Sequence, residues 1–231
     1  MKGQIHQLCK AAFLLAMLWG AFAGHAQTIP LQLPDGYGTL RLGVVCGEES
    51  RWLDKCEITK DGTRYIIRSE LWRDGSVELT LCPLTDAEGF IVKATRNNLP
   101  ADARLCWAFG ACNDKASQRP PLCEINPQAC KDNVFSTEGN AFTVYHGEVM
   151  RLRITQGVMP LGSEMRLADA HKQESPLTLY NSGKKTDAPV LSALCPWQEG
   201  QPLYLCVHKP GRNADYAHFM LPELFDKLYK D

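Results

Sequence analysis

Apolar and polar residues alternate along most of the chain with a period of two. Successive side chains of a strand point to opposite faces of a sheet, so this alternation is typical of half-buried β-strands. Asp61-Gly62 and Asp74-Gly75 add hairpin-turn signals between such runs. The pattern predicts about eleven short strands, at residues 39–45, 64–71, 77–82, 90–95, 104–109, 142–145, 150–155, 164–167, 177–180, 190–194 and 203–207.

Many short antiparallel strands separated by turns indicate a sandwich or a barrel. We expect an all-β fold, a large antiparallel two-sheet sandwich over residues 27–217. Residues 218–231 are expected to form a short C-terminal helix, which either packs on the sandwich or begins a linker to an absent domain. Its apolar face comprises Leu221, Leu224, Phe225 and Leu228.

The N-terminus has the parts of a secretory signal peptide. Lys2 and Lys10 supply positive charge, residues 11–23 are apolar, and Ala26 ends a small-residue cleavage site. The apolar run is shorter than the ~20 residues that a membrane span needs. We therefore expect a cleaved signal peptide over residues 1–26 and a periplasmic or secreted mature chain without a transmembrane segment.

The charges are nearly balanced and interspersed, with a formal net charge of −1. The chain has no basic patch, so nucleic acid is not an expected partner. Cleavage removes Cys9 and leaves an odd number of cysteines, so at least one thiol is unpaired within the chain. The cysteine spacings fit no C-x2-C zinc pattern, and we expect neither a metal nor a cofactor. Four cysteines lie in apolar strand runs and are expected to be buried, namely Cys46, Cys82, Cys106 and Cys206.

Residues 110–133 interrupt the strand pattern with a polar, proline-containing segment. A loop longer than about 12–15 residues in a compact domain is usually functional or disordered. Its three cysteines favour an ordered loop, because an oxidising compartment permits a disulfide among them. We expect this loop to face a ligand or a neighbouring domain. Its candidate residues are Asp114 and Arg119 for ligand binding, and Cys112, Cys123 and Cys130 for a disulfide.

Four tryptophans lie beyond the signal segment, and core packing is favoured over ligand stacking for all of them. Trp107 stands in an apolar run and is expected in the core. Trp72 precedes the Asp74-Gly75 turn, and Trp197 lies in a polar loop. Trp72 and Trp197 are therefore the two expected to be most exposed, and they are candidate ligand-binding residues that could stack on a sugar ring.

Two further sets of side chains could carry chemistry. A pair of carboxylates could act as acid and base in sugar hydrolysis, although solvated surface groups are the favoured interpretation. His146, Glu148 and His171 resemble metal ligands, but a hairpin turn with exposed polar side chains explains them more simply. No serine stands in a nucleophile-elbow motif. The carboxylates nearest polar loops are Asp114, Glu124, Glu148 and Glu164.

Several phrases together resemble a known family. They are LCWAFGA at 105–111, AFTVYHGEVMRLR at 141–153, RLADAHKQESPLTLYNS at 166–182, QPLYLCVH at 201–208 and ADYAHFMLPELF at 214–225. Over about residues 33–226 the chain resembles a domain of unknown function at the front of large secreted gut-bacterial proteins. In those proteins it resembles a β-supersandwich and precedes an (α/α)6 six-hairpin glycosidase core.

The resemblance implies a non-catalytic module of a carbohydrate-active protein, because the catalytic carboxylates of such glycosidases lie on the helical barrel. Its role would be scaffolding or glycan contact, and its partners a polysaccharide or oligosaccharide and a helical catalytic domain. Two alternatives stay open. The chain could be a self-contained β-sandwich polysaccharide hydrolase or lyase, or an envelope interaction protein without a sugar ligand.

Overall fold

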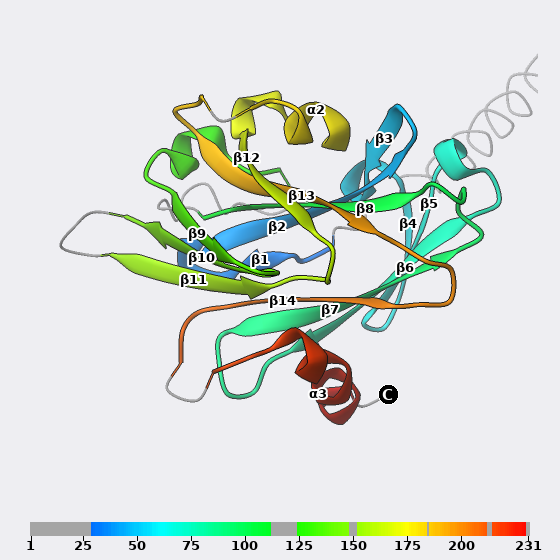
Figure 1. The fold of residues 1–231 in the computed structure, drawn as a ribbon. Coiled ribbons are helices and arrows are strands. Elements are labelled where there is room, and N and C mark those ends of the chain that lie inside the picture. The colour runs from blue at the N-terminus through cyan, green and yellow to red at the C-terminus, as the bar shows by residue number, and fades with distance from the viewer. Residues whose placement is uncertain (1–28, 112–123, 148–151, 184, 212–213, 230–231) are drawn as a thin grey trace, which may run out of the picture.

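The structure is a computed structural model that describes residues 29–111, 124–147, 152–183, 185–211 and 214–229. Within them the chain forms two antiparallel sheets that face each other (Figure 1), which confirms the predicted all-β sandwich. In the described part of the chain, no helix is long and apolar enough to cross a membrane.

The smaller sheet has the strand order β1-β2-β8-β13-β12, and β3 also pairs with β2. Its strands are Gln32–Leu33 (β1), Gly38–Cys46 (β2), Glu49–Trp52 (β3), Arg104–Gly110 (β8), Glu164–Asp169 (β12) and Pro189–Pro196 (β13).

The larger sheet has the strand order β4-β5-β6-β7-β14-β11-β10-β9, so β4 and β9 are its two edges. Its strands are Glu57–Asp61 (β4), Arg64–Arg68 (β5), Ser76–Pro83 (β6), Gly89–Asn97 (β7), Val134–Glu138 (β9), Ala141–His146 (β10), Arg153–Val158 (β11) and Leu203–His208 (β14).

Inward-facing side chains of both sheets form the main core. Leu42 and Trp107 of the smaller sheet and Phe142 and Leu205 of the larger one belong to one cluster of buried residues. The Trp107 and Phe142 rings stack across it, with centroids 5.9 Å apart. Alternate residues of each strand therefore fill the space between the sheets, as the period of two requires.

A C-terminal helix, α3 (Leu221–Leu228), packs on the outer face of the larger sheet. Leu221 and Phe225 are buried there against residues of β6, β7 and β14. The Phe225 ring meets Tyr204 edge-on, with centroids 5.7 Å apart. The predicted apolar helix face thus packs on its own sandwich, and α3 lies beneath β14 and β7 (Figure 1).

The predicted strand at 177–180 is wrong, because these residues belong to the short helix α2 (Pro176–Tyr180). Ser175 caps it by accepting a hydrogen bond from the Thr178 amide at 3.1 Å, and Pro176 occupies the first turn. Capping and proline chemistry outweigh the two-residue alternation of Leu-Thr-Leu-Tyr. The helix covers the outer face of the smaller sheet (Figure 1).

The other predicted strand runs overlap observed strands, and Asp61-Gly62 is the turn between β4 and β5. Asp74-Gly75 lies in the connection between β5 and β6. Four strands carry little apolar alternation and were not predicted, namely β1, β3, β4 and β9. They are short or largely exposed, so burial imposes little pattern on them.

Candidate functional site

The outer face of the larger sheet is covered over only part of its width. Helix α3 packs on β6, β7 and β14, while the outer side of β9, β10 and β11 borders a groove of about 550 Å³. We call this the open groove. It is lined by Ser136, Glu138, Ala141, Phe142, Thr143, Gln156, Gly157, Val158, His208, Gly211, Ala214, Asp215 and Tyr216.

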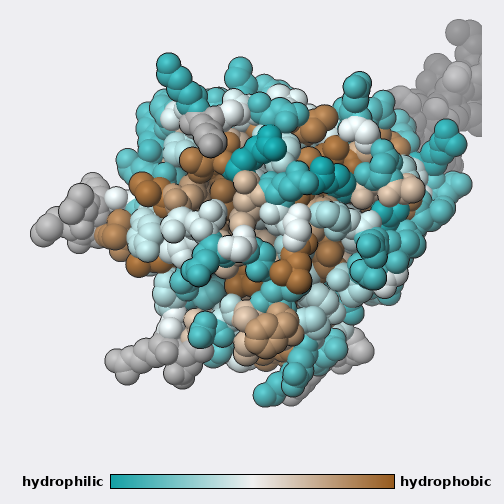
Figure 2. Space-filling model, in the orientation of Figure 1, coloured by the Kyte–Doolittle hydropathy of each residue, from teal (hydrophilic) through white to brown (hydrophobic). Residues whose placement is uncertain are grey.

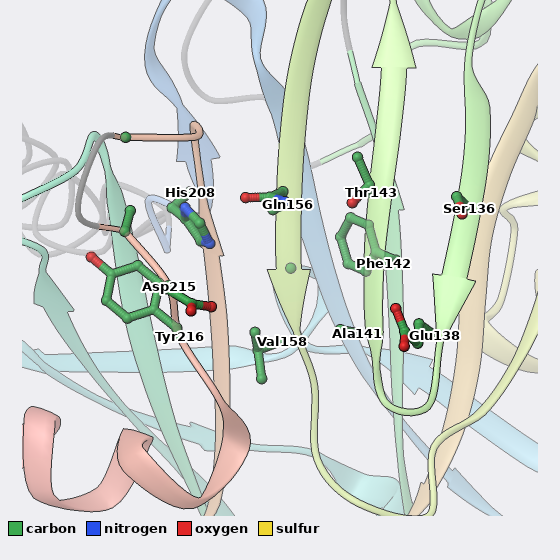
Figure 3. Close-up of a pocket in the computed structure, with 13 residues that line it drawn as sticks. Ser136, Glu138, Ala141, Phe142, Thr143, Gln156, Val158, His208, Asp215 and Tyr216 are labelled. Atoms are coloured by element: carbon green, nitrogen blue, oxygen red, sulfur yellow. The ribbon is translucent and has the colours of Figure 1, made fainter.

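The strand register places a polar row across the centre of the open groove. Thr143 on β10 is opposite Ser136 on β9 and Gln156 on β11. Gln156 is in turn opposite His208 on β14. Residues directly opposite on one face lie about 4.5–5.5 Å apart at Cβ. The row is therefore continuous over four strands, as Figure 3 shows.

The central polar groups have no side-chain partner in the part of the chain that the structure describes. The side chains of Ser136, Thr143 and Gln156 make no hydrogen bond with any other described residue. Two hydroxyls and a carboxamide offer both donors and acceptors. They are available to a polar ligand in the groove.

One wall of the open groove is fixed by a buried histidine. His208 lies edge-on to Tyr216, with ring centroids 4.7 Å apart, and its Nδ1 is 2.9 Å from the Lys209 carbonyl oxygen. Burial lowers the pKa of His208, and the Tyr216 hydroxyl donates to Asp86. This wall is therefore held by internal contacts, and the exposed carboxylate of Asp215 projects beside it (Figure 3).

The floor of the open groove is continuous with the core. Gly157 on β11 lies over the Phe142 ring, where a Cβ would be 2.2 Å from Cε1 of that ring. Phe142 packs in turn on Trp107, Phe109 and Phe135. The ring cluster holds the floor rigidly below the polar row.

An apolar margin borders the polar row on its side toward the start of β9 and the end of β10. Tyr145 on β10 is opposite Val134 on β9 and Ile154 on β11. Tyr145 is 37% exposed and Val134 63% exposed. Figure 2 shows apolar residues gathered at this end of the molecule, on the left of the view. An exposed phenol ring thus stands two residues along the strand from the hydroxyl and carboxamide groups.

Trp72 and Trp197, the candidates for stacking on a sugar ring, are buried, in agreement with the favoured core-packing interpretation. Their exposed fractions are 2% and 3%, and both belong to the main core cluster. Each lies in a polar turn whose backbone directs the indole inward. Arg96 fixes the second turn by donating to the Trp197 carbonyl oxygen at 2.6 Å. Neither ring offers a face on which a sugar could stack.

The candidate ligand-binding residues Asp114 and Arg119 lie outside the described residues, as do Cys112 and Cys123. A disulfide among the three loop cysteines therefore remains a prediction. The described end of the loop packs on the smaller sheet, where Ile125 and Cys130 are buried.

The other predicted carboxylates and histidines are also placed, except Glu148, which lies outside the described part. Glu124 pairs with Lys55 at 2.7 Å, and Glu164 with Arg104 at 2.8 Å. The expectation that His146 is an exposed turn residue is wrong, because it ends β10 and is fully buried. No cluster of three or more His, Cys, Asp or Glu side chains suited to a metal is found among the described residues.

The cysteines of the strand runs are mostly buried, as predicted. Cys82, Cys106 and Cys206 are at most 2% exposed, whereas Cys46 is half-buried. Burial raises the pKa of the Cys106 thiol to about 12. A thiol that stays protonated is a poor nucleophile, so these residues act as small apolar core residues.

The sequence did not identify the residues of the open groove. The alternation in 142–145 and 150–155 predicted strands there, but not that their outer face would lack a cover. The signal that could have been found is that small or polar side chains stand at Ser136, Thr143 and Gln156, where a face covered by another element would need apolar ones.

Comparisons with known proteins give a similar solved structure and a family. The chain is similar to a solved structure of a bacterial glucoamylase complexed with acarbose, with 11% sequence identity and a TM-score of 0.48. That alignment covers 85% of this chain and 31% of the glucoamylase chain, so this chain spans about a third of its length. No curated protein matches. Residues 33–228 match the family described as Domain of unknown function (DUF4450), and the chain therefore belongs to this family.

Proposed function

We propose that the chain is a non-catalytic module of a carbohydrate-active protein and that its open groove contacts a glycan. The observation that carries this proposal is the row of Ser136, Thr143 and Gln156 side chains beside the exposed Tyr145 ring. Hydroxyls and carboxamides donate and accept hydrogen bonds, which suits the hydroxyls of a sugar. The tyrosine ring offers apolar surface to the C–H face of a sugar.

The dimensions of the open groove support an oligosaccharide ligand. Its volume of about 550 Å³ lies within the range of about 300–1,000 Å³ for small-molecule sites. From β9 to β14 it crosses three strand spacings, on the order of 14 Å. The groove ends at the edge strand β9, so an extended chain can leave it there without meeting another strand.

The arrangement of carboxylates favours binding over hydrolysis. The groove carries Glu138 on β9 and Asp215 beside β14, on opposite walls (Figure 3). Strand β9 is three strand spacings from β14, on the order of 14 Å, and Asp215 lies in the chain that follows β14. Catalytic carboxylate pairs of glycosidases are about 5–10 Å apart. The position of Glu138 and Asp215 on opposite walls of the groove supports binding over the hydrolase alternative.

The proposal is tested by affinity electrophoresis of residues 27–231 in gels containing different polysaccharides. Gln156→Ala and Tyr145→Ala should each reduce retardation by a retaining polysaccharide by about tenfold in apparent affinity. The reason is that each removes a hydrogen-bonding group or a stacking surface worth roughly 1–1.5 kcal/mol.

Gln198→Ala is the matched control, because Gln198 is exposed outside the groove. It should leave retardation unchanged. If no polysaccharide in a broad panel retards the protein, glycan contact is excluded. If retardation survives both groove substitutions, the ligand binds elsewhere.

Scaffolding is a second candidate function, and an exposed apolar pair favours it. Phe219 and Met220, just before α3, are 82% and 41% exposed. Such residues suit contact with a further domain, and we propose the helical catalytic domain of a longer protein. Calorimetry of that longer protein should show the two domains unfolding in one coupled transition. The Phe219→Ser variant should show two separate transitions. Two independent transitions without the substitution would rule this role out.

We also propose that the chain is exported, with cleavage near Ala26 and a periplasmic or secreted location. The sequence features of residues 1–26 support this, and those residues lie outside the described part. N-terminal sequencing of protein recovered from the periplasm or medium should begin at Gln27. Recovery of the uncleaved chain from the cytoplasm alone would contradict it.

A further inference from the structure

A second hollow, of about 490 Å³, lies at the opposite edge of the larger sheet from the open groove. Two chain corners form it. One joins β3 to β4, and the other joins β5 to β6. We call it the arginine pocket, because Arg51, Arg68 and Arg73 line it together with Lys55.

Among the described residues, nothing pairs with the guanidinium groups of the arginine pocket. Lys55 pairs with Glu124, but no ion pair joins Arg51, Arg68 or Arg73 to a carboxylate in the described part of the chain. Glu57 and Glu70 also line the hollow without pairing with them. As far as the described residues go, three arginines in one hollow therefore keep their side-chain donors free.

Arginines elsewhere in the molecule behave differently. Arg41 pairs with Asp54 at 2.9 Å, and Arg96 with Glu199 at 3.0 Å. Arg64 pairs with Glu78, and Arg104 pairs with Glu164 of β12. Arg153 donates to the Asp35 carbonyl oxygen at 2.7 Å, and Arg166 lies over the Tyr180 ring, so each described arginine outside the pocket has a partner, be it a carboxylate, a carbonyl or a ring. Figure 2 shows hydrophilic residues covering the β4–β5 end, on the right of the view.

The backbone sets the positions from which the three arginine side chains extend. Arg51 lies on β3 opposite Val44 of β2, and Arg68 ends β5 opposite Glu57 of β4. Arg73 follows the buried Trp72 and has φ 49° and ψ −112°. A non-glycine residue persists in such a conformation only where its surroundings determine it, and such positions cluster at binding sites.

We propose that the arginine pocket binds a single oxyanionic group: sulfate, phosphate or carboxylate. A guanidinium presents planar paired donors that match two oxygens of such a group. A nucleic acid is not the favoured ligand, because nucleic-acid-binding proteins present a basic patch or stripe that follows the phosphate backbone. Three guanidiniums in a single hollow suit one small anionic group. This inference does not depend on the open groove.

Isothermal titration with sodium sulfate, against sodium chloride at equal ionic strength, tests the proposal on residues 27–231. Arg68→Ala and Arg73→Ala should each weaken sulfate affinity by about tenfold or more, since each removes a charge-assisted donor pair. Arg68→Lys should weaken sulfate affinity less than Arg68→Ala does, because lysine keeps the charge but lacks the planar donors.

Arg64→Ala is the matched control, because Arg64 lies on the same strand but pairs with Glu78 outside the pocket. It should change sulfate affinity by less than about twofold. The absence of saturable binding of sulfate, phosphate and acetate would overturn the proposal. An equal loss in the Arg64 variant would also overturn it, because binding would then reflect net charge alone.

A second titration separates the sources of the oxyanion. Glucose 6-sulfate that binds more tightly than inorganic sulfate would show that the pocket takes an anion carried on a sugar. Equal or weaker binding would assign it to the free ion. Gln156→Ala should leave both titrations unchanged, so failure of glycan contact in the open groove and failure of the arginine pocket are separately visible.

Discussion

Gly157 shows at the scale of one residue how the floor of the open groove is made. Its missing side chain lets the Phe142 ring lie directly beneath β11, where a Cβ would approach Cε1 to 2.2 Å. That ring stacks on Trp107 and reaches the centre of the core. The groove floor and the core therefore depend on the same glycine.

Gly157→Ala should destabilise the protein by about 1–3 kcal/mol, because the new methyl group overpacks the site above Phe142. Urea unfolding followed by tryptophan fluorescence measures the change. In a double-mutant cycle, Phe142→Leu should offset part of the loss, because the smaller side chain makes room. A Gly157→Ala variant as stable as the unsubstituted protein would mean that the ring moves aside at no cost.

Single residues were also where prediction from the sequence was weakest. Trp72 and Trp197 stand among polar neighbours, yet both are buried. His146 stands beside a glycine at a strand end, yet it is buried against Tyr37, with ring centroids 5.7 Å apart. The neighbours of a turn residue along the chain do not determine its orientation. The packing partner from another part of the chain does.

At the scale of elements, α3 is the piece whose packing decides which part of the larger sheet stays open. Leu221 and Phe225 bury its apolar face against β14 and its neighbours. The helix reaches β11 only at that strand's last residue, Val158, and leaves uncovered the rest of the outer side of β9, β10 and β11, which forms the open groove. One face of the sheet is thereby divided into a covered half and an exposed half.

Phe225→Ala should destabilise the protein by about 3 kcal/mol, because it removes a buried aromatic ring and leaves a cavity next to Tyr204. Phe219→Ala is the matched control, because Phe219 lies just before α3 and is 82% exposed; it should change stability by less than about 0.5 kcal/mol. Thermal unfolding of both variants measures the difference. Equal effects would mean that α3 does not contribute to the cooperative unit.

Elements were the scale at which the sequence predicted best. Two-residue alternation located the central strands such as β6, β7 and β8, since burial of one face imposes that period. It misassigned α2, where a serine cap and a proline set the conformation. It also missed the edge strand β9, whose side chains are mostly exposed and therefore carry no pattern.

At the scale of the whole molecule, buried histidines couple stability to pH. Burial, with a further contribution from Arg153, lowers the pKa of His146 to about 4, against about 6.5 in an unfolded chain. Burial lowers the pKa of His208 in the same direction. Between these pKa values the unfolded chain binds a proton that the folded chain does not, so stability falls as the pH falls.

The free energy of unfolding should therefore be highest above about pH 6.5 and should decrease toward about pH 4. The contribution of His146 to this decrease is up to roughly 3 kcal/mol. Urea unfolding over this range measures the slope. His146→Gln should flatten it, because the amide does not titrate. A variant that keeps the original slope would assign the acid sensitivity to other groups.

The sequence by itself determined the strands of the sandwich centre, the amphipathic C-terminal helix and the burial of most strand cysteines. Each depends on a local pattern that burial imposes on neighbouring residues. Only the tertiary structure decided that Trp72 and Trp197 point inward, that β9–β11 keep an open polar row, and that three arginines meet in one pocket. Those features join residues distant in the chain, because strand order, register and the packing of α3 bring them together, and no short stretch of sequence records such contacts.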